Sequence, residues 1–157
     1  MKKIRSSKKG FTLAELLIVV AIIGVLVGIS IPIFTAQLEK SREATDIANL
    51  RAAKAAAVAA YLEGAPEKPG DDTAITWKKD SNNVYDGSFE TYYDASEGKL
   101  VKDAPSDGYG EGTGVTGSAN NEQFGYKPGT SVQDQVIKIV VDKEGVCTFS
   151  WVAKAQA

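Results

Sequence analysis

The chain has 157 residues and a formal net charge of −2, from 18 basic and 20 acidic residues. That length allows one domain plus one extended element. The sequence has no histidine and a single cysteine, Cys147. This composition excludes an internal disulfide, a Cys/His metal site and histidine-based catalysis.

The chain begins with a strongly basic leader. No acidic residue precedes Gly10, whereas five basic residues do: Lys2, Lys3, Arg5, Lys8 and Lys9. Removal of residues 1–10 would leave 13 basic against 20 acidic residues, a side-chain charge of −7. A chain this acidic is not expected to bind nucleic acid through bulk electrostatics.

An apolar segment of membrane-spanning length follows the leader. Residues 16–38 form a run of 23 without a charge, and about 17–25 residues span a bilayer. Because the preceding flank is basic, we expect the N-terminus in the cytoplasm and the C-terminal part outside. A cleaved secretory signal is the alternative, but its apolar core is about 7–15 residues long and ends in a small-residue site, which is not evident here.

One carboxylate, Glu15, lies at the start of this apolar segment. An ionised side chain inside a bilayer costs on the order of 2.5–3.5 kcal/mol. Glu15 can lie near the helix end and reach the headgroups, where it also suits the positive end of the helix dipole. Alternatively it pairs with a cation. Cleavage after Gly10 would create an α-amino group on Phe11, and Glu15 of one subunit could pair with the Phe11 amine of the next.

The stretch from Lys8 to Phe34 resembles a type IV prepilin: a basic leader, Gly10, then Phe11-Thr12-Leu13-Ala14-Glu15 and an apolar helix. The resemblance implies cleavage after Gly10 by the membrane-embedded prepilin peptidase, followed by N-methylation of Phe11. It also implies that Glu15 neutralises a neighbour's N-terminus during recruitment into the filament.

By this resemblance, the protein is expected to be a structural subunit of a type IV pilus. The precursor would be held in the cytoplasmic membrane, and an assembly platform there would polymerise it through the N-terminal helices into an extracellular helical homopolymer. A type II secretion pseudopilin and a competence pilin share the same N-terminal signal and remain alternatives. A signal-anchored extracellular binding or enzyme domain is the alternative from another class, although no catalytic constellation is visible.

Three residues of the apolar segment favour close packing and bending. Gly24 and Gly28 form a G-x-x-x-G motif, which lets membrane helices approach closely. Pro32 removes a backbone donor and crowds the carbonyl of Gly28. Together they predict a helix that is kinked or locally melted between Gly24 and Pro32. A proline simply tolerated in a membrane helix is the alternative.

Residues 39–63 are amphipathic. Apolar side chains recur near helical spacing at Ile47, Leu50, Ala57, Val58, Tyr61 and Leu62. The charged side chains fall mainly on other faces: Glu39, Arg42, Glu43, Asp46, Arg51 and Lys54. Gly64 and Pro66 supply a stop signal. We therefore expect one continuous or kinked helix from about Thr12 to Leu62, ~75 Å long, with two separate helices as the competing interpretation.

The C-terminal part is expected to form a small antiparallel sheet. Strand-like runs lie at 74–78, 89–93 and 99–101, after a linker at 65–72. The clearest hairpin joins 136–142 to 146–152 through a three-residue loop with Gly145 in the left-handed conformation. This loop places Val141 opposite Cys147, and likewise residue 139 opposite 149 and residue 137 opposite 151. The face should pack on the outer half of the helix, with Cys147 as a small core residue.

The glycine-rich stretch 103–121 is expected to be an exposed loop. Its match to a dinucleotide fingerprint at 112–117 lacks the strand, helix and acidic residue that such a site needs. Its acidic residues do not follow a calcium-loop spacing, so we expect a solvated acidic surface, with no metal and no cofactor.

The expected fold class is therefore α+β, a long N-terminal helix packed against a small antiparallel sheet, as the pilin resemblance also implies. The expected organisation is a leader at 1–10, a transmembrane and filament-core half-helix at 11–38, an amphipathic half-helix at 39–63 and a globular domain at 64–157. Many pilins close the C-terminal region with a disulfide. The single Cys147 departs from that pattern and is more similar to the cysteine-poor pilins of some Gram-positive bacteria.

Overall fold

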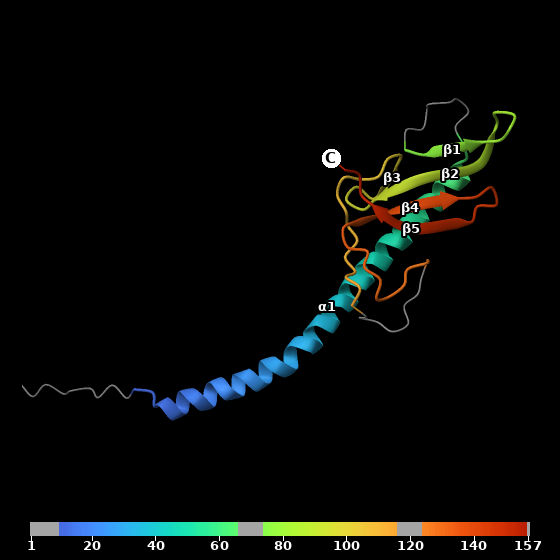
Figure 1. The fold of residues 1–157 in the computed structure, drawn as a ribbon. Coiled ribbons are helices and arrows are strands. Elements are labelled where there is room, and N and C mark those ends of the chain that lie inside the picture. Colours follow the sequence, from blue (N-terminus) through green and yellow to red (C-terminus); the bar gives the residue numbers. More distant parts are fainter. Residues whose placement is uncertain (1–9, 66–73, 116–123, 157) are drawn as a thin grey trace, which may run out of the picture. The chain divides into compact units, whose positions relative to one another are not determined.

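The computed structural model describes residues 10–65, 74–115 and 124–156. It contains one long helix and one antiparallel sheet (Figure 1). Contacts within the chain divide it into two compact units, one ending at Thr35 and the other beginning at Ala36. The sheet and the second half of the helix belong to the second unit.

Helix α1 runs unbroken from Leu13 to Glu63, 51 residues. The predicted continuous helix is confirmed, and the interpretation as two separate helices is wrong. Gly64 ends the helix at φ 81°, donating its N–H to the carbonyl of Ala60 at 3.2 Å. A locally melted segment between Gly24 and Pro32 is not present in this isolated chain, since every residue between them is helical. Without neighbouring subunits, the internal backbone hydrogen bonds keep the segment regular.

The sheet has five antiparallel strands. They are β1 (Thr76–Lys79), β2 (Tyr85–Asp94), β3 (Lys99–Val101), β4 (Gln135–Val141) and β5 (Cys147–Ala153). The main order is β1-β2-β4-β5, and β3 pairs with the end of β2. The predicted strands 74–78 and 89–93 correspond to β1 and β2, although β2 starts four residues earlier than expected.

The predicted register of the last hairpin is confirmed. Val141 pairs with Cys147, Ile139 with Phe149 and Ile137 with Trp151. Gly145 has φ 81°, as the three-residue loop requires. This loop fixes which side chains of both strands face the helix.

The core of the second unit lies between the outer half of α1 and the inward face of the sheet. Its buried members on the helix are Ile47, Leu50, Ala53 and Ala57, and those on the strands are Phe89, Tyr93, Ile137, Ile139 and Val141. Cys147 packs at the edge of this cluster and is half-buried. The expected α+β architecture is confirmed.

The buried stripe of the helix differs from the predicted one. Val58 and Leu62 are exposed, and three expected surface acids, Glu39, Glu43 and Asp46, are buried. The stripe follows positions 39, 43, 46, 50, 53 and 57, at helical spacing. The two exposed apolar residues lie off this line.

The loop expected at 103–121 is only partly exposed over its described residues, 103–115. Gly110 and Gly112 are buried, and a methyl group on Gly110 would lie 2.1 Å from the carbonyl oxygen of Val132. Packing against residues 131–134 and the helix therefore requires glycine here. Residues 116–121 lie outside the described residues, as does most of the expected linker.

Candidate assembly and processing site

The first turn of α1 is closed by a reciprocal capping box between Thr12 and Glu15. Glu15 Oε2 accepts the N–H of Thr12 at 2.8 Å and its hydroxyl at 2.7 Å, while Thr12 Oγ1 accepts the N–H of Glu15 at 3.2 Å. These bonds satisfy backbone donors that the helix leaves free. Our sequence interpretation missed Thr12, although its spacing to Glu15 is the usual capping-box signal.

The predicted processing residues lie just ahead of this turn. Gly10 and Phe11 are not helical and are exposed, with Phe11 87% exposed. A peptidase binds a scissile bond in an irregular, accessible segment more readily than inside a helix. The structure thus brings Gly10, Phe11, Thr12 and Glu15 together at one helix end.

Glu15 keeps an oxygen available for another group. Both bonds to its carboxylate fall on Oε2, and no bond from the described residues reaches Oε1. A carboxylate accepts several hydrogen bonds at once, so capping its own helix does not exhaust it. An ammonium group from outside the chain could approach Oε1 without breaking the cap.

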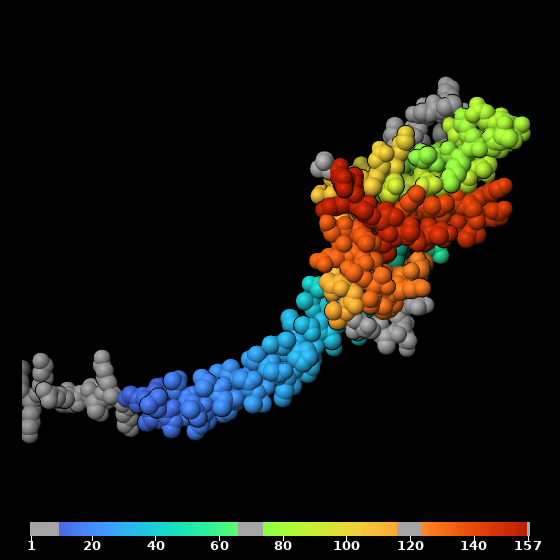
Figure 2. All heavy atoms as spheres, in the orientation of Figure 1, coloured from blue at the N-terminus to red at the C-terminus, as the bar shows by residue number. Residues whose placement is uncertain are grey.

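Every residue of the helix from 13 to 35 is exposed, and Figure 2 shows one side of this segment uncovered. Its large hydrophobic side chains between Leu16 and Leu38 are 42–69% exposed. The helix is also long and apolar enough to cross a membrane. A helix that is apolar all round is stable when lipid or other helices cover it.

The apolar half of the helix is narrowest at Gly24 and Gly28, which have no side chains. A methyl group built on either glycine meets nothing within 4 Å, so the space beside the backbone is open to a neighbouring helix. Pro32 lies inside the helix one turn further on. The hydroxyls of Ser30 and Thr35 donate back to the carbonyls of Leu26 and Pro32, at 2.7 and 3.0 Å.

Within residues 10–65, 74–115 and 124–156, the predicted acidic surface does not gather into a site. Among the described residues, no group of three or more Asp, Glu, Cys or His side chains could hold a metal ion. Asp71 and Asp72, two acidic residues of the expected linker at 65–72, lie outside the described residues, as does the end of the dinucleotide-like motif.

Comparisons with known proteins agree with this geometry. A family model described as "Prokaryotic N-terminal methylation motif" matches residues 5–31. The chain is 32% identical over 144 residues to Fimbrial protein Q of Moraxella bovis, covering 91% of this chain and 85% of that protein. A fimbrial protein of Dichelobacter nodosus is 30% identical over 142 residues, covering 89% and 79%. One from Pseudomonas aeruginosa is 45% identical over 58 residues, covering 37% and 38%. No solved structure matches the chain significantly.

An apolar helix with a capped, exposed N-terminal junction, carried on a small antiparallel sheet domain, defines a filament-forming membrane-anchored subunit. The chain belongs to the type IV pilin family, and it carries the class III type of signal peptide. It is a structural subunit of a pilus, made as a membrane-anchored precursor that prepilin peptidase processes and that polymerises into a surface filament. Its relatives are fimbrial proteins.

Proposed function

We propose that prepilin peptidase cuts the Gly10–Phe11 bond and that Phe11 is then N-methylated. The bond lies in an exposed, non-helical segment directly before the capped helix. The basic residues before it favour a cytoplasmic position. The domain beyond residue 38 then lies outside the membrane, and the filament subunit consists of residues 11–157.

Glu15 is the assembly residue in this proposal. In a membrane that contains other subunits, Oε1 of Glu15 accepts a hydrogen bond from the methylated amine of a neighbour's Phe11. This pairing compensates two charges that are costly in an apolar environment. It also sets the axial stagger between subunits, because both groups lie within one turn of the helix start. The single observation that carries the proposal is this one carboxylate at the start of a helical segment, residues 13–35, that is otherwise uncharged and is uncovered.

The segment from Gly24 to Pro32 changes conformation on assembly. Two glycines and a proline lower the cost of breaking the helix there. Neighbouring helices can approach closest at Gly24 and Gly28. The regular helix of the isolated chain is then the membrane-stored form. An assembly platform in the cytoplasmic membrane extracts it. The chain itself supplies structure and carries no catalytic residue.

The roles of Glu15 can be separated by two variants. Glu15→Gln keeps an acceptor for Thr12 but removes the charge, whereas Thr12→Ala weakens the cap by about 1 kcal/mol and keeps the charge. We expect Glu15→Gln to reduce the pilin recovered by shearing at least tenfold, roughly the effect of losing one charge-assisted bond, and Thr12→Ala to leave it near the wild-type amount. Immunoblots of sheared and membrane fractions measure both. Wild-type assembly of Glu15→Gln would show that the charge is not needed.

A further inference from the structure

The sheet domain first holds the helix through carboxylates rather than through apolar side chains. The second compact unit begins at Ala36, and the first buried helix side chain after that point is Glu39, 2% exposed. Asp46 follows two turns later and is fully buried. Buried apolar side chains of the helix begin only at Ile47. The first buried contacts between the domain and the helix are therefore polar.

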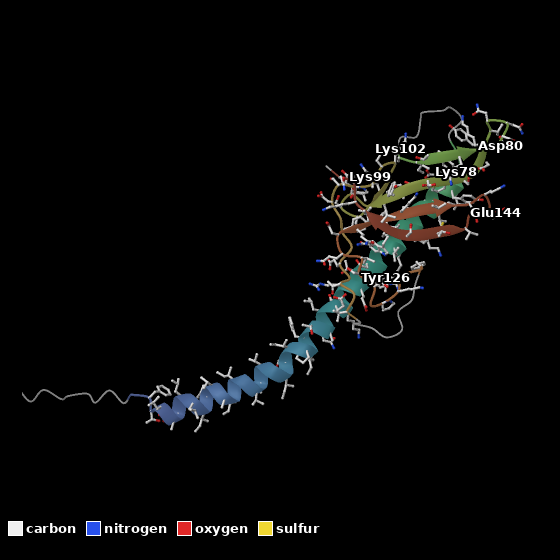
Figure 3. All side chains as sticks on the ribbon, viewed as in Figure 1. Lys78, Asp80, Lys99, Lys102, Tyr126 and Glu144 are labelled. Atoms are coloured by element: carbon white, nitrogen blue, oxygen red, sulfur yellow. The ribbon has the colours of Figure 1, made fainter. Side chains whose placement is uncertain are left out.

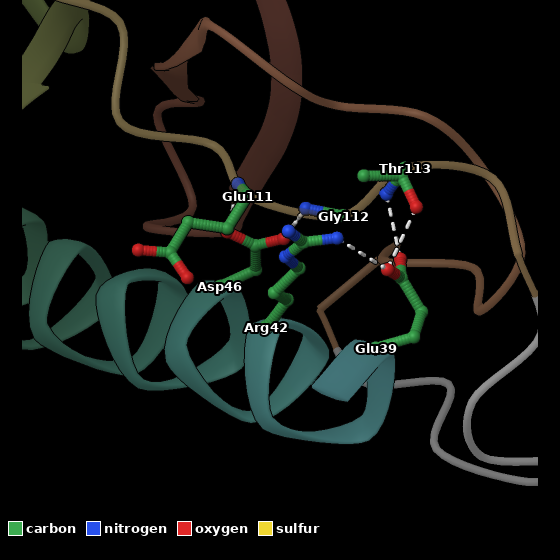
Figure 4. A network of polar contacts seen from close by, with 6 residues as sticks. All are labelled: Glu39, Arg42, Asp46, Glu111, Gly112 and Thr113. Carbon is green, nitrogen blue, oxygen red and sulfur yellow. Dashed lines mark hydrogen bonds and ion pairs between the residues drawn. The ribbon is translucent and has the colours of Figure 1, made fainter. Parts of the chain in front are cut away.

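Four hydrogen bonds join these two carboxylates to the loop segment 111–113 (Figure 4). Asp46 Oδ1 and Oδ2 accept the N–H groups of Glu111 and Gly112, each at 2.9 Å. Glu39 Oε1 accepts the N–H of Thr113 at 2.6 Å, and its Oε2 accepts the Thr113 hydroxyl at 2.7 Å. We call this set of contacts between Glu39, Asp46 and residues 111–113 the carboxylate clamp.

The loop backbone lies close enough for these bonds because residue 112 is glycine. A methyl group there would lie 2.8 Å from the Tyr126 hydroxyl and 3.1 Å from Asp46 Oδ2. Tyr126 is itself buried beside the outer half of the helix (Figure 3). A larger residue at 112 would push the loop away from the helix, so the close approach is built into the sequence.

The clamp is tied into the rest of the domain on its other side. The N–H of Val132 donates to the carbonyl of Gly112 and that of Asp134 to Gly110, each at 2.9 Å. Arg42 adds a third contact to Glu39, an ion pair at 3.3 Å. Because hydrogen bonds to an ionised acceptor are stronger than those between neutral groups, the helix between residues 39 and 46 is held firmly to the domain.

We propose that the carboxylate clamp is the stop at which unwinding of the helix ends during filament assembly. This inference rests on the proposed remodelling between Gly24 and Pro32. Residues 13–35 have only lipid or neighbouring helices to support them, whereas Glu39 is bonded within its own subunit. Unwinding that starts at the glycines therefore proceeds toward the domain only as far as Glu39, and the globular domain keeps a fixed register on the helix.

Hydrogen exchange read by mass spectrometry tests this directly. The protein carrying Glu39→Gln and Asp46→Asn, expressed as the whole precursor, would be compared with the wild type, both as the processed subunit in sheared filaments and solubilised in detergent. The matched control carries Glu63→Gln and Asp103→Asn, which change exposed acids of the same helix and the same loop. Fluorescence of Trp77 and Trp151 verifies that the globular domain is folded in each variant.

In wild-type filaments we expect fast exchange at 24–32 and slow exchange from residue 39 onward. In the clamp variant, fast exchange should extend to about residue 46, and the amides of 111–113 should exchange about tenfold faster or more. The control should match the wild type. Two results would overturn the proposal. The first is slow exchange at 39–46 in the clamp variant although its 111–113 amides exchange fast. The second is full protection of the 24–32 amides in wild-type filaments.

The detergent sample separates this inference from the proposed function. There no filament is needed, and the variant should speed exchange at 36–46 more than at 47–57. Equally faster exchange in both segments would contradict the proposal that the clamp stops unwinding. If the wild type formed no filaments while the detergent result held, the proposed function would fail and the clamp would stand as a property of the subunit.

Discussion

At the scale of single residues, the two clamp carboxylates respond differently to burial. Burial raises the pKa of the Asp46 carboxyl above its usual 3.8, despite the donors Glu111 and Gly112. Burial acts in the same direction on Glu39, but the donors Thr113 and Arg42 outweigh it and lower the pKa of that carboxyl below 4.5. Glu39 therefore stabilises the folded domain at neutral pH as an anion.

Replacement of Glu39 should lower the stability of the folded domain by an amount that depends on pH. Because its folded pKa lies below its unfolded value of 4.5, its contribution is fully present above that pH and is lost as the pH falls below it. Glu39→Gln should lower the free energy of unfolding by about 1–3 kcal/mol near neutral pH, with a smaller difference at about pH 3. Denaturant unfolding in detergent measures it, with Glu63→Gln as control. An equal difference at both pH values would contradict the assignment.

Cys147 should be a slow nucleophile. Burial raises the pKa of its thiol, and Asp142 adds to this effect while Lys54 opposes it. The thiolate fraction at neutral pH is therefore reduced. Alkylation by iodoacetamide should be ~3–10-fold slower in the folded chain than in the denatured chain, as measured by intact mass over time. Equal rates would place the thiol in solvent.

At the scale of elements, the turn of the β4–β5 hairpin joins the sheet to the helix end. Gly145 has φ 81°, and a methyl group there would lie 2.8 Å from the ring of Tyr61. The Tyr61 hydroxyl also donates to the carbonyl of Lys143 at 2.9 Å. One glycine therefore serves both the turn and the helix packing.

Gly145→Ala should cost about 2–3 kcal/mol of stability, from left-handed strain plus overpacking. Gly87 provides the matched control, because it has φ 85° but nothing within 4 Å of an added methyl group. Gly87→Ala should cost only the strain, about 1–2 kcal/mol. Thermal unfolding by circular dichroism compares them. Equal shifts in Tm would mean that Tyr61 moves aside freely.

Tyr109 bridges β2 and β4 at Tyr93 and Ile137, the pair that ends their ladder. Its hydroxyl donates to the carbonyl of Tyr93 at 2.6 Å and accepts the N–H of Ile137 at 2.8 Å. Tyr109→Phe should destabilise the domain by about 1–3 kcal/mol because two buried backbone groups lose their partner. Tyr92→Phe, on the outward face of β2, is the control. Unchanged exchange of the Ile137 amide would contradict this bridge.

Local chemistry made the elements predictable. Gly64 ended the helix where expected, and the loop before Val146 set the hairpin register. Basic residues, Gly10 and Glu15 indicated the proposed processing junction, and the spacing of Thr12 to Glu15 already carried the signal of the cap. The buried acids were not predictable, because a helical pattern assigns charged side chains to solvent. Their partners are loop amides 65–74 residues away, and no local spacing shows such a contact.

At the scale of the whole molecule, the chain combines a helix segment that needs other molecules to cover it with a domain that covers its own half. Residues 13–35 are exposed apolar helix, whereas the outer half packs on its own sheet. This division suits a subunit that is stored in lipid and then transferred to a bundle of identical helices. An uncovered apolar half-helix and a self-contained domain are both consistent with membership of the pilin family.

The most direct test of the account is the intact mass of the chain in material sheared from the cell surface. We expect a chain that begins at Phe11 and carries one added methyl group, since processing, methylation and export would then have occurred on the same molecule. A full-length chain that still carries residues 1–10 and is found only in membranes would contradict the account.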